Sequence, residues 1–358
     1  MKKTKKILFL SPYPFGTAPS QRLKYEQYYD ALQQNGFSIT TRSFVSLNFW
    51  KIIYQKGFLF LKIAYTLFGY LGRFFDLLTI RKYDVVYIHL WVTPLGLPIF
   101  EYLVCLFAKK VIYDIDDMIY LQQDSSRFID KIKGRKKPII LMKKANHVIV
   151  CSPFLRDFVS KYNKNISVIL ATYDTEKSLP IKNHIEKDII SIGWTGTHST
   201  LKYLEIIRPI IAEIAAIRKI EFLVICNAPY HTNNINIKNI HWTAENELDD
   251  LRKIDIGVYP LEKEEWVLGK SGNKALAYMN LSIPCVATNF GTNQLVIQNG
   301  ENGFLADNAA DWKKYLLLLI DSAALRERIG IAARMSVENY YSVKNNTQTY
   351  IDILSKSV

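Results

Sequence analysis

The sequence predicts an α/β protein with two doubly wound domains, each built on a parallel sheet flanked by helices. The chain has 358 residues, which is long for one ordinary domain. Short apolar runs alternate with longer helical patterns along most of it, as is typical of parallel α/β architecture. A polar stretch, Asp174–Asp188, interrupts the alternation once and predicts a linker. We therefore expect domains over residues 1–175 and 176–338, followed by a terminal helix over 339–358.

Each half contributes six expected strands. In the first half the apolar runs are Lys6–Leu10, Ser38–Ser43, Val85–His89, Lys110–Asp114, His147–Cys151 and Ile166–Leu170. In the second half they are Ile189–Gly193, Glu221–Cys226, Ile240–Thr243, Ile256–Tyr259, Pro284–Thr288 and Gly303–Leu305. Among the helices between them, Ser20–Asn35 has Ser20 as a helix N-cap and Gly36 as its end signal. Ligands of such sheets bind beyond the carboxyl ends of the strands, so a site is expected there.

The composition indicates a cytoplasmic protein. Hydrophobic residues make up 49% of the chain and charged residues 22%, which supplies a core of ordinary size. The four cysteines are scattered without a CxxC pair, which favours reduced thiols over a disulfide framework or a zinc site. The apolar stretch Ile7–Leu10 is too short for the core of a signal peptide. No run of about 18 uncharged apolar residues predicts a membrane-spanning helix.

The net charge of +13 comes from the first half of the chain. Through Thr175 there are 26 Lys and Arg against 12 Asp and Glu, and in the remainder 20 against 21. This asymmetry indicates an anionic partner of the first half, namely a membrane, a nucleic acid or a phosphorylated substrate, with general solubility as the alternative. We recognise no nucleic-acid-binding module in this half.

The stretch Phe49–Tyr83 is rich in aromatic and aliphatic residues, with Lys and Arg spaced along it. A basic, aromatic helix can lie in a membrane interface, where a lipid-linked acceptor would reside. The alternative is an unusually apolar pair of core helices.

The segment around Gly269–Met279 predicts an anion site. It opens a helix just before a strand, and backbone N–H groups at a helix N-terminus attract anions. Gly272 allows close approach of a ligand to the backbone, and Lys270 and Lys274 add two cations on one side of the helix start. Lysines at this position oppose the helix dipole unless an anion is bound. The alternative is a solvated loop with ordinary surface lysines.

Two further loops carry candidate residues. Gly193–Thr200 combines two glycines with four hydroxyl residues between a strand and a helix, which suits a phosphate cradle or a helix cap formed by Ser199 or Thr200. Asp114-Ile115-Asp116-Asp117 ends an apolar run, and a D-x-D pair can hold magnesium or manganese.

The stretch GKSGNKALAYMNLSIPCVAT resembles the donor site of retaining GT-B glycosyltransferases, the group 1 family that is also called family 4. It is most similar to the subgroup with a GK-x-G-x-K-x-x-x-YM signature. The resemblance extends over almost the whole chain and includes IGWTGTHSTLKYL and YDIDD. It implies a GT-B fold of two Rossmann-like domains facing each other across a cleft. The N-terminal domain would bind the acceptor, the C-terminal domain the nucleotide sugar, and the terminal helix would return to the N-terminal domain.

The chain departs from the family pattern at the donor site. The usual glutamate pair, with seven residues between its members, would fall at Gly269 and Ala277, which are not acidic. Glu264 or Glu265 could compensate. Lys270 and Lys274 are our candidates for neutralising the diphosphate, in place of the family's arginine–lysine pair.

The resemblance also implies roles for individual residues. Gly16 would lie near the diphosphate, with Arg22 close behind it unless Arg22 pairs with Glu26 instead. Trp242 would contact the nucleotide base, where an aromatic face suits stacking. Asp116 occupies the place of a histidine that faces the donor sugar in many relatives, and its carboxylate can align the acceptor or accept a proton.

The local motifs and the resemblance together predict the residues of the site. The catalytic residues are Asp116, Lys270 and Lys274. The donor-binding residues are Gly16, Gly193, Thr195, Gly196, Thr197, Trp242, Lys270, Ser271, Gly272 and Lys274. The acceptor-binding residues are Arg22 and Asp117. No metal and no cofactor are expected, because in this fold lysines and helix dipoles meet the charge of the donor.

The predicted function is sugar transfer from a nucleotide diphosphate sugar to a saccharide acceptor, with retention at the anomeric carbon. A lipid-linked acceptor, an anionic membrane surface, and a place in bacterial-type surface polysaccharide or glycan synthesis belong to this prediction, and nucleic acid does not. The enzyme would be cytoplasmic and peripheral at the inner face of the cell membrane. The alternatives are a sugar-nucleotide epimerase of the same architecture and a nucleotide-sugar-binding protein without catalysis.

Overall fold

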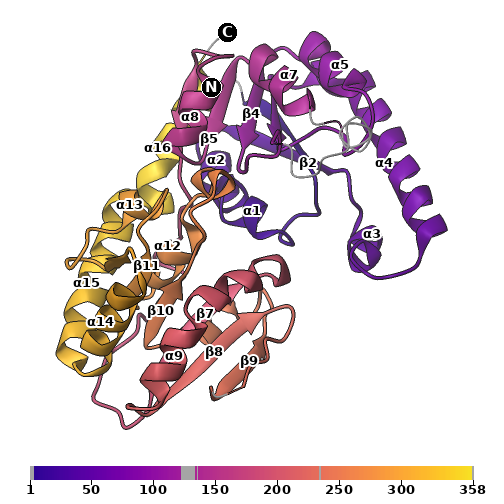
Figure 1. Cartoon of the computed structure of the whole chain (residues 1–358). Helices are drawn as coiled ribbons and strands as arrows, with labels where there is room; N and C mark the ends of the chain where they lie inside the picture. The colour runs from indigo at the N-terminus through magenta and orange to yellow at the C-terminus, as the bar shows by residue number, and fades with distance from the viewer. Residues whose placement is uncertain (1–3, 122–133, 135, 234, 357–358) are drawn as a thin grey trace. The chain divides into compact units, whose positions relative to one another are not determined.

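The computed structural model describes residues 4–121, 134, 136–233 and 235–356. The chain divides into two compact units, Met1–Leu170 with Asn346–Val358, and Ala171–Asn345. Each unit contains one six-stranded sheet whose strands are all parallel, with helices on its faces (Figure 1). The predicted α/β class with two doubly wound domains is confirmed.

The sheet of the first unit has the strand order β2-β1-β3-β4-β5-β6. Its strands are β1 (Lys5–Ser11), β2 (Phe37–Ser43), β3 (Val85–His89), β4 (Val111–Ile115), β5 (His147–Val150) and β6 (Ile166–Val168). β3 and β4 are buried along their whole length, as expected of central strands covered on both faces. All six predicted strands of this half are present, within two residues at each end.

The helices of the first unit vary widely in length. They are α1 (Pro19–Arg22), α2 (Tyr29–Gln34), α3 (Leu47–Ile52), α4 (Leu59–Thr79), α5 (Ile99–Phe107), α7 (Lys136–Lys144) and α8 (Pro153–Val159), with 3₁₀ turns η1 (Glu26–Tyr28) and η2 (Ile80–Lys82). The prediction of one helix over Ser20–Asn35 is wrong. Ala18 is the N-cap of α1 because Pro19 starts the helix, and the chain breaks again before η1.

The sheet of the second unit has the order β12-β11-β10-β7-β8-β9. Its strands are β7 (Ile190–Gly196), β8 (Ile220–Cys226), β9 (Ile237–His241), β10 (Ile256–Tyr259), β11 (Cys285–Thr288) and β12 (Phe304–Ala306). β7 extends three residues beyond the predicted end at Gly193, because Thr195 and Gly196 still pair with β8.

The helices of the second unit cover both faces of this sheet. They are η3 (His198–Ile206), α9 (Arg208–Ala215), α10 (Glu247–Leu251), α11 (Glu265–Leu268), α12 (Asn273–Asn280), α13 (Asn293–Val296), α14 (Ala309–Ile320) and α15 (Ala323–Tyr340).

The last helix, α16 (Val343–Ser355), packs on the first unit. Tyr350 lies against Tyr28 with ring centroids 4.3 Å apart. The ammonium groups of Lys5 and Lys110 donate to backbone carbonyls near the end of α16, at Ser355 (2.6 Å) and Ile353 (2.7 Å). These lysines lie at the amino ends of β1 and β4, so α16 closes that edge of the first sheet.

The helical stretch Leu59–Lys82 is long and apolar enough to cross a membrane by length and composition. The sequence predicted no membrane-spanning helix because it contains no uncharged apolar run of about 18 residues. That criterion is too strict for this stretch. Little of this stretch is buried within the protein.

Candidate functional site

The second sheet reverses its strand order between β10 and β7, so the connections on either side run in opposite directions. In open parallel sheets the crevice at the carboxyl ends of two such strands is the usual ligand site. β7 ends at Gly196 and β10 at Tyr259, so the loops that follow these residues border the crevice.

Helix α12 is fixed at this crevice by Tyr278. The phenol ring lies over Gly257 of β10, where an added Cβ would come within 2.5 Å of ring carbons. The phenol oxygen accepts a hydrogen bond from the N–H of Thr195 at 2.9 Å. One side chain of α12 thus holds the helix against both strands that border the crevice.

Lys274 lies one helical turn before Tyr278 and points to the same place. Its ammonium nitrogen is 5.1 Å from the ring centroid of Tyr259 and 5.5 Å from that of Trp194. Gly196 leaves room for the Trp194 ring and for Lys274, because a Cβ there would be 2.4 Å from the ring and 2.9 Å from Cε of Lys274. The structure therefore brings Thr195, Gly196 and the Lys274 ammonium together at the carboxyl ends of β7 and β10.

The start of α12 has the backbone form that the sequence predicts. Gly272 is its N-cap with φ +70°, a conformation that favours glycine, and no side chain caps the helix there. The Thr292 hydroxyl bonds to the carbonyl oxygen of Lys270 and anchors this loop. The ammonium of Lys270 lies over the ring of Trp266, a residue of α11, at 5.7 Å from the ring centroid. Ser271 is half-buried in the loop between α11 and α12.

Gly193 has a different role from the one predicted. It is buried inside β7, and a Cβ there would approach the Ile254 side chain to 2.3 Å. Its missing side chain serves packing within the unit, so the predicted phosphate loop shortens to the residues from Thr195 onward. Thr197 is the exposed N-cap of η3, without a side-chain cap bond from it or from the predicted Ser199 or Thr200.

The loops after β7 and β8 are joined by His198 and Asn227. The Asn227 amide oxygen accepts a hydrogen bond from the N–H of His198 at 2.8 Å, and its nitrogen lies 3.3 Å from Nδ1 of the same residue. His198 is thereby held as part of the loop structure.

Trp242 directly follows β9, two strands away from β7 in the sheet. It is half-buried, and its indole N–H donates to the Glu247 carboxylate at 3.3 Å. Since neighbouring strands are about 4.8 Å apart, Trp242 follows a strand about 10 Å from β7 at the same edge of the sheet. This spacing suits a nucleotide with its phosphates at Lys274 and its base near Trp242.

The family position of the first glutamate, Gly269, and that of the second, Ala277, are both buried in this unit. Glu264 is exposed in the loop after β10 and lies 3.9 Å from Lys202. Glu265 is exposed in the first turn of α11. Glu264 is therefore the better placed of the two candidate substitutes, because its loop follows a strand that borders the crevice.

The first unit has its own reversal of strand order, between β1 and β3. The loop after β1 is held by Glu26, which accepts from the N–H of Gly16 at 2.9 Å and from the Gln21 amide at 3.0 Å. Gly16 has φ +77°. Burial raises the pKa of the Glu26 carboxyl, while these two hydrogen bonds act in the opposite direction. Arg22, in α1, is one of the positive charges that act on Glu26.

A buried polar network lies at the carboxyl end of β4. Asp114 is fully buried and pairs with the Lys24 ammonium, and it accepts from the phenol of Tyr87 at 2.7 Å. His89 Nδ1 lies 3.3 Å from the same carboxylate. Burial alone would raise the pKa of Asp114, but Lys24 and His89 hold it below its ordinary value.

Asp116 and Asp117 follow β4 and are half-buried. Asp116 lies 3.6 Å from the Lys24 ammonium, and its carbonyl oxygen accepts from the Cys151 thiol at 2.9 Å. A lysine therefore already stands between the two carboxylates of the D-x-D pair. Among the described residues no group of three His, Cys, Asp or Glu side chains is arranged to hold a metal ion.

Sequence reasoning missed Lys24 and His89, and it considered Glu26 only as a partner of Arg22. Each is a single polar residue within a helical or an apolar pattern. Such patterns predict whether a residue is exposed or buried, and they do not predict a hydrogen-bond partner. The only available signal was the clustering of polar residues at strand ends.

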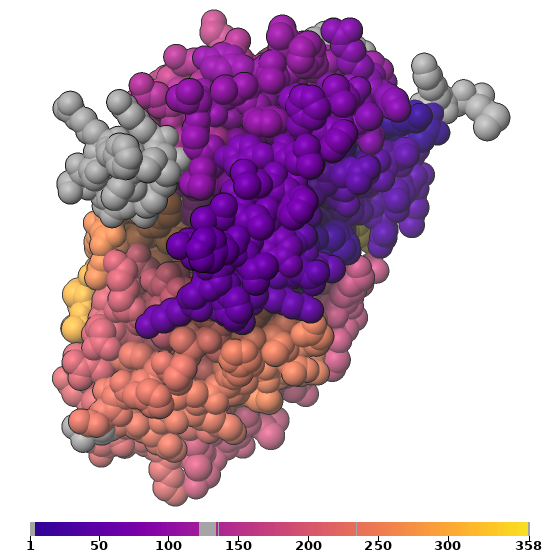
Figure 2. Space-filling view, turned by 90° about the vertical axis from the view of Figure 1, so that its right-hand side faces the viewer, coloured from indigo at the N-terminus to yellow at the C-terminus, as the bar shows by residue number. Residues whose placement is uncertain are grey.

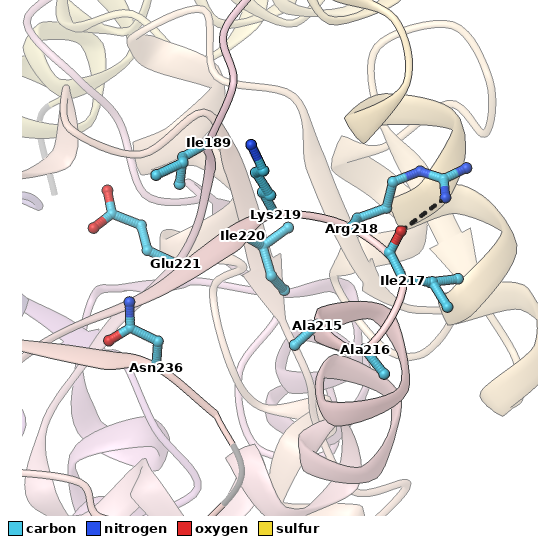
Figure 3. A pocket seen from close by; sticks show the side chains of 9 residues that line it. All are labelled: Ile189, Ala215, Ala216, Ile217, Arg218, Lys219, Ile220, Glu221 and Asn236. Carbon is cyan, nitrogen blue, oxygen red and sulfur yellow. Dashed lines mark hydrogen bonds between the residues drawn. The ribbon is translucent and has the colours of Figure 1, made fainter.

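A pocket of about 610 Å³ lies away from both of these strand-order reversals (Figure 3). Its lining includes Ile189, Lys219 and Ile220, at the amino ends of β7 and β8. Arg218 at its border pairs with Asp321 through a bidentate contact of 2.7 and 3.0 Å. The charged side chains that line it, Arg218, Lys219 and Glu221, already have partners.

Residues 187–322 match the family model described as glycosyl transferases group 1. No curated protein sequence matches the chain. The match covers the crevice between β7 and β10 with Lys270 and Lys274, and it supports a glycosyltransferase.

Solved structures resemble the chain over nearly its whole length. A glycosyltransferase from Rickettsia africae has a TM-score of 0.70 at 15% identity, covering 99% of this chain and 98% of that one. Sucrose-phosphate synthase from Thermosynechococcus elongatus has a TM-score of 0.68 at 13% identity, with 98% of both chains covered. HepE from Anabaena, in complex with UDP and glucose, has a TM-score of 0.64 at 13% identity, covering 98% and 100%. The fold of this chain is GT-B, with two Rossmann-like domains.

Proposed function

We propose that this protein transfers a sugar from a nucleotide diphosphate sugar to a saccharide acceptor, with retention at the anomeric carbon. The observation that carries the proposal is Lys274, whose ammonium lies at the carboxyl ends of β7 and β10 where the strand order reverses. A cation at this point is suited to a diphosphate, because ligands of such sheets bind there.

In the reaction, the bond between the anomeric carbon and the terminal phosphate oxygen of the donor breaks. A bond forms between the anomeric carbon and the acceptor hydroxyl oxygen, and the hydroxyl proton is released. Negative charge grows on the departing diphosphate, and Lys274 and Lys270 stabilise it electrostatically. The N-terminus of α12, which no side chain caps, adds the partial positive charge of its backbone N–H groups.

The remaining donor contacts follow from the same crevice. Thr195, Gly196 and Thr197 border the phosphates, Ser271 and Gly272 bring the backbone of the α12 loop close to them, and Trp242 stacks on the base. HepE was solved with UDP and glucose, which makes UDP the first nucleotide to test. Gly193 is not included, since its role is packing.

The first unit supplies the acceptor side. Asp116 aligns the acceptor hydroxyl or takes its proton, Gly16, Arg22 and Asp117 complete the loops around it, and no metal takes part. The support for metal independence is Lys24, which neutralises Asp114 and lies 3.6 Å from Asp116.

We further propose that the acceptor is lipid-linked, and that the enzyme works at the inner face of the cell membrane in surface polysaccharide or glycan synthesis. The support is the excess of positive charge in the first half of the chain, 26 Lys and Arg against 12 Asp and Glu through Thr175.

The test is product analysis with UDP-, GDP- and dTDP-sugars, with and without saccharide acceptors, for the wild type and for the double variant Lys270→Ala/Lys274→Ala. Release of the nucleoside diphosphate by the wild type, its increase with an acceptor and its loss in the variant would support transfer. An epimerised nucleotide sugar from donor alone would instead identify an epimerase. Normal turnover of the double variant would overturn the assignment of the donor site.

A further inference from the structure

We propose that the exposed face of α4 and α5 docks on an anionic lipid bilayer and lies in its interface without crossing it. This inference rests on the proposed function for its purpose, since it names the surface through which the enzyme reaches a lipid-linked acceptor. Its evidence is independent of catalysis and lies within the first unit.

The outer side of α4 carries a continuous apolar stripe. Its residues recur at steps of three and four, which places them on one side of a helix, and every one is exposed: Phe60, Ile63, Leu67, Leu71, Phe74 and Leu78. Phe60 is 86% exposed. A soluble helix normally has the reverse arrangement, with its apolar side against the core. Residues of this segment, in purple, form much of the face of the first unit that Figure 2 turns to the viewer.

The inner side of α4 is fixed by polar contacts of Arg73 and by packing on Phe44. Arg73 is 2% exposed, and its guanidinium donates to the carbonyl oxygens of Ser11 and Val92, both at 2.9 Å. It also pairs with Asp76 at 3.0 Å. Gly69 lets the Phe44 ring approach closely, because a Cβ there would be 2.7 Å from the ring. These contacts hold the apolar stripe outward.

Helix α5 widens the same face. It lies beside α4, and the phenol of Tyr70 donates to the carbonyl oxygen of Leu95, in the loop before α5, at 2.6 Å. Ile99, Tyr102 and Leu106 are exposed on α5, and Leu97 is exposed in the loop before it. Two adjacent helices thus present one apolar surface, and contiguous patches of this kind mark interaction sites.

Cations lie at the edge of this surface. The guanidinium of Arg81 is 5.8 Å from the ring centroid of Phe107, and the Lys144 ammonium is 5.1 Å from that of Tyr102. Aromatic rings with cations above them suit the level of the lipid headgroups, where the ring meets hydrocarbon and the charge meets phosphate. The cations therefore select an anionic bilayer as the occupant.

The inner side of α4 argues against a membrane-spanning helix. Crossing the bilayer would take Arg73 and Asp76 away from their partners and into hydrocarbon, which is unfavourable for charged groups. Lying in the interface keeps every one of these contacts. A second copy of the chain is a poorer occupant, because a symmetric contact through this face would bring the same cations of both copies together.

The experiment is flotation of the purified full chain with vesicles of phosphatidylglycerol and phosphatidylethanolamine, and with vesicles of phosphatidylcholine alone. The variant Leu67→Glu/Leu71→Glu places two carboxylates on the stripe. Its matched control is Ile331→Glu/Met335→Glu, which changes two exposed apolar residues at the same spacing on α15 of the second unit.

We expect the wild type and the control to float with the anionic vesicles and to bind phosphatidylcholine at least about tenfold more weakly. The stripe variant should lose about tenfold or more of its binding to the anionic vesicles, while keeping its circular dichroism spectrum and thermal midpoint. Charge reversal by Arg81→Glu should weaken binding to anionic vesicles and leave binding to phosphatidylcholine unchanged.

Flotation of the stripe variant equal to that of the wild type would overturn the proposal. So would a wild type that does not float but forms a dimer that the stripe variant abolishes. Nucleotide release toward a water-soluble saccharide acceptor should be the same in the stripe variant and the wild type. Failure of docking therefore leaves the proposed transfer standing, and failure of transfer leaves the flotation result unchanged.

Discussion

The phenol oxygen of Tyr278 accepts a hydrogen bond from the backbone N–H of Thr195 at 2.9 Å, and this contact fixes α12 to β7. Because Lys274 lies one turn earlier on α12, the same contact also sets the position of its ammonium group.

Tyr278→Phe should therefore weaken both the fold and nucleotide binding. The ring can still pack on Gly257, but the Thr195 N–H loses its acceptor, which costs about 1–3 kcal/mol of unfolding free energy. Thermal unfolding and calorimetric titration with UDP measure the two effects. Tyr340→Phe, at an exposed tyrosine, is the control and should change neither. A Tyr278→Phe protein with unaltered stability and affinity would mean that the contact does not fix the helix.

Gly196 and Gly193 should respond differently to alanine. Gly196→Ala places a methyl group 2.4 Å from the buried Trp194 ring and 2.9 Å from Cε of Lys274, so it should reduce nucleotide affinity as well as stability. Gly193→Ala collides with the buried Ile254 side chain and should reduce stability, by about 1–3 kcal/mol as for an overpacked core. Denaturant unfolding and nucleotide titration of both variants decide. If the ratio of lost nucleotide affinity to lost unfolding free energy were the same in the two variants, the assignment of Gly196 to the crevice would be wrong.

Lys24→Met should lower the free energy of unfolding, and this loss should be greater at pH 7 than at pH 5. In the wild type the pKa of Asp114 is lowered, so its ionised form stabilises the fold above its unfolded-state pKa of about 3.9. This stabilisation is lost as the pH falls through the lowered folded-state pKa. Without Lys24, burial favours the protonated carboxyl, and the variant should be about 3–5 kcal/mol less stable at pH 7.

The difference between Lys24→Met and the wild type should therefore shrink as the pH falls from about 7 to 5, where protonation of Asp114 removes the uncompensated charge. Urea unfolding at several pH values measures this trend. Lys109→Met removes an exposed lysine from Asp84 and should cost at most about 1 kcal/mol. A Lys24→Met deficit that is independent of pH would show that the pair does not govern the ionisation of Asp114.

Gly16→Ala tests the loop after β1. The residue has φ +77°, and a Cβ would meet nothing within 4 Å, so the cost is backbone strain of about 1–2 kcal/mol. Gly72→Ala in the exposed part of α4 is the matched control and should stabilise the helix by up to about 1 kcal/mol. Thermal unfolding of both variants gives the comparison. Stabilisation by Gly16→Ala would contradict the left-handed conformation of this loop.

The central strands of both sheets could be predicted from the sequence because they are buried on both faces. A central strand such as Val85–His89 then appears as a short apolar run, whatever lies around it. Strand ends were less predictable. β7 continues through Thr195 and Gly196 because these residues pair with Ile225 and Cys226, and that partner strand is not visible in the local pattern.

The candidate site could be predicted where a motif determines the backbone, and not where distant residues meet. Gly272 and Lys274 lie at a helix start that the local sequence defines. Lys24 reads locally as a solvent-facing helical residue, and only the fold shows that it neutralises Asp114, which lies far along the chain. The helix over Ser20–Asn35 failed for the same reason, since the chain breaks where Lys24 and Glu26 turn inward.

The most direct test of the donor site is calorimetric titration of Lys274→Met with whichever of UDP, GDP and dTDP binds the wild type. Loss of one charge-assisted contact should weaken binding by about tenfold to a hundredfold. Lys313→Met, at an exposed lysine paired with Glu213, should bind the nucleotide as the wild type does. Unchanged affinity in Lys274→Met would contradict the placement of the diphosphate at the carboxyl ends of β7 and β10.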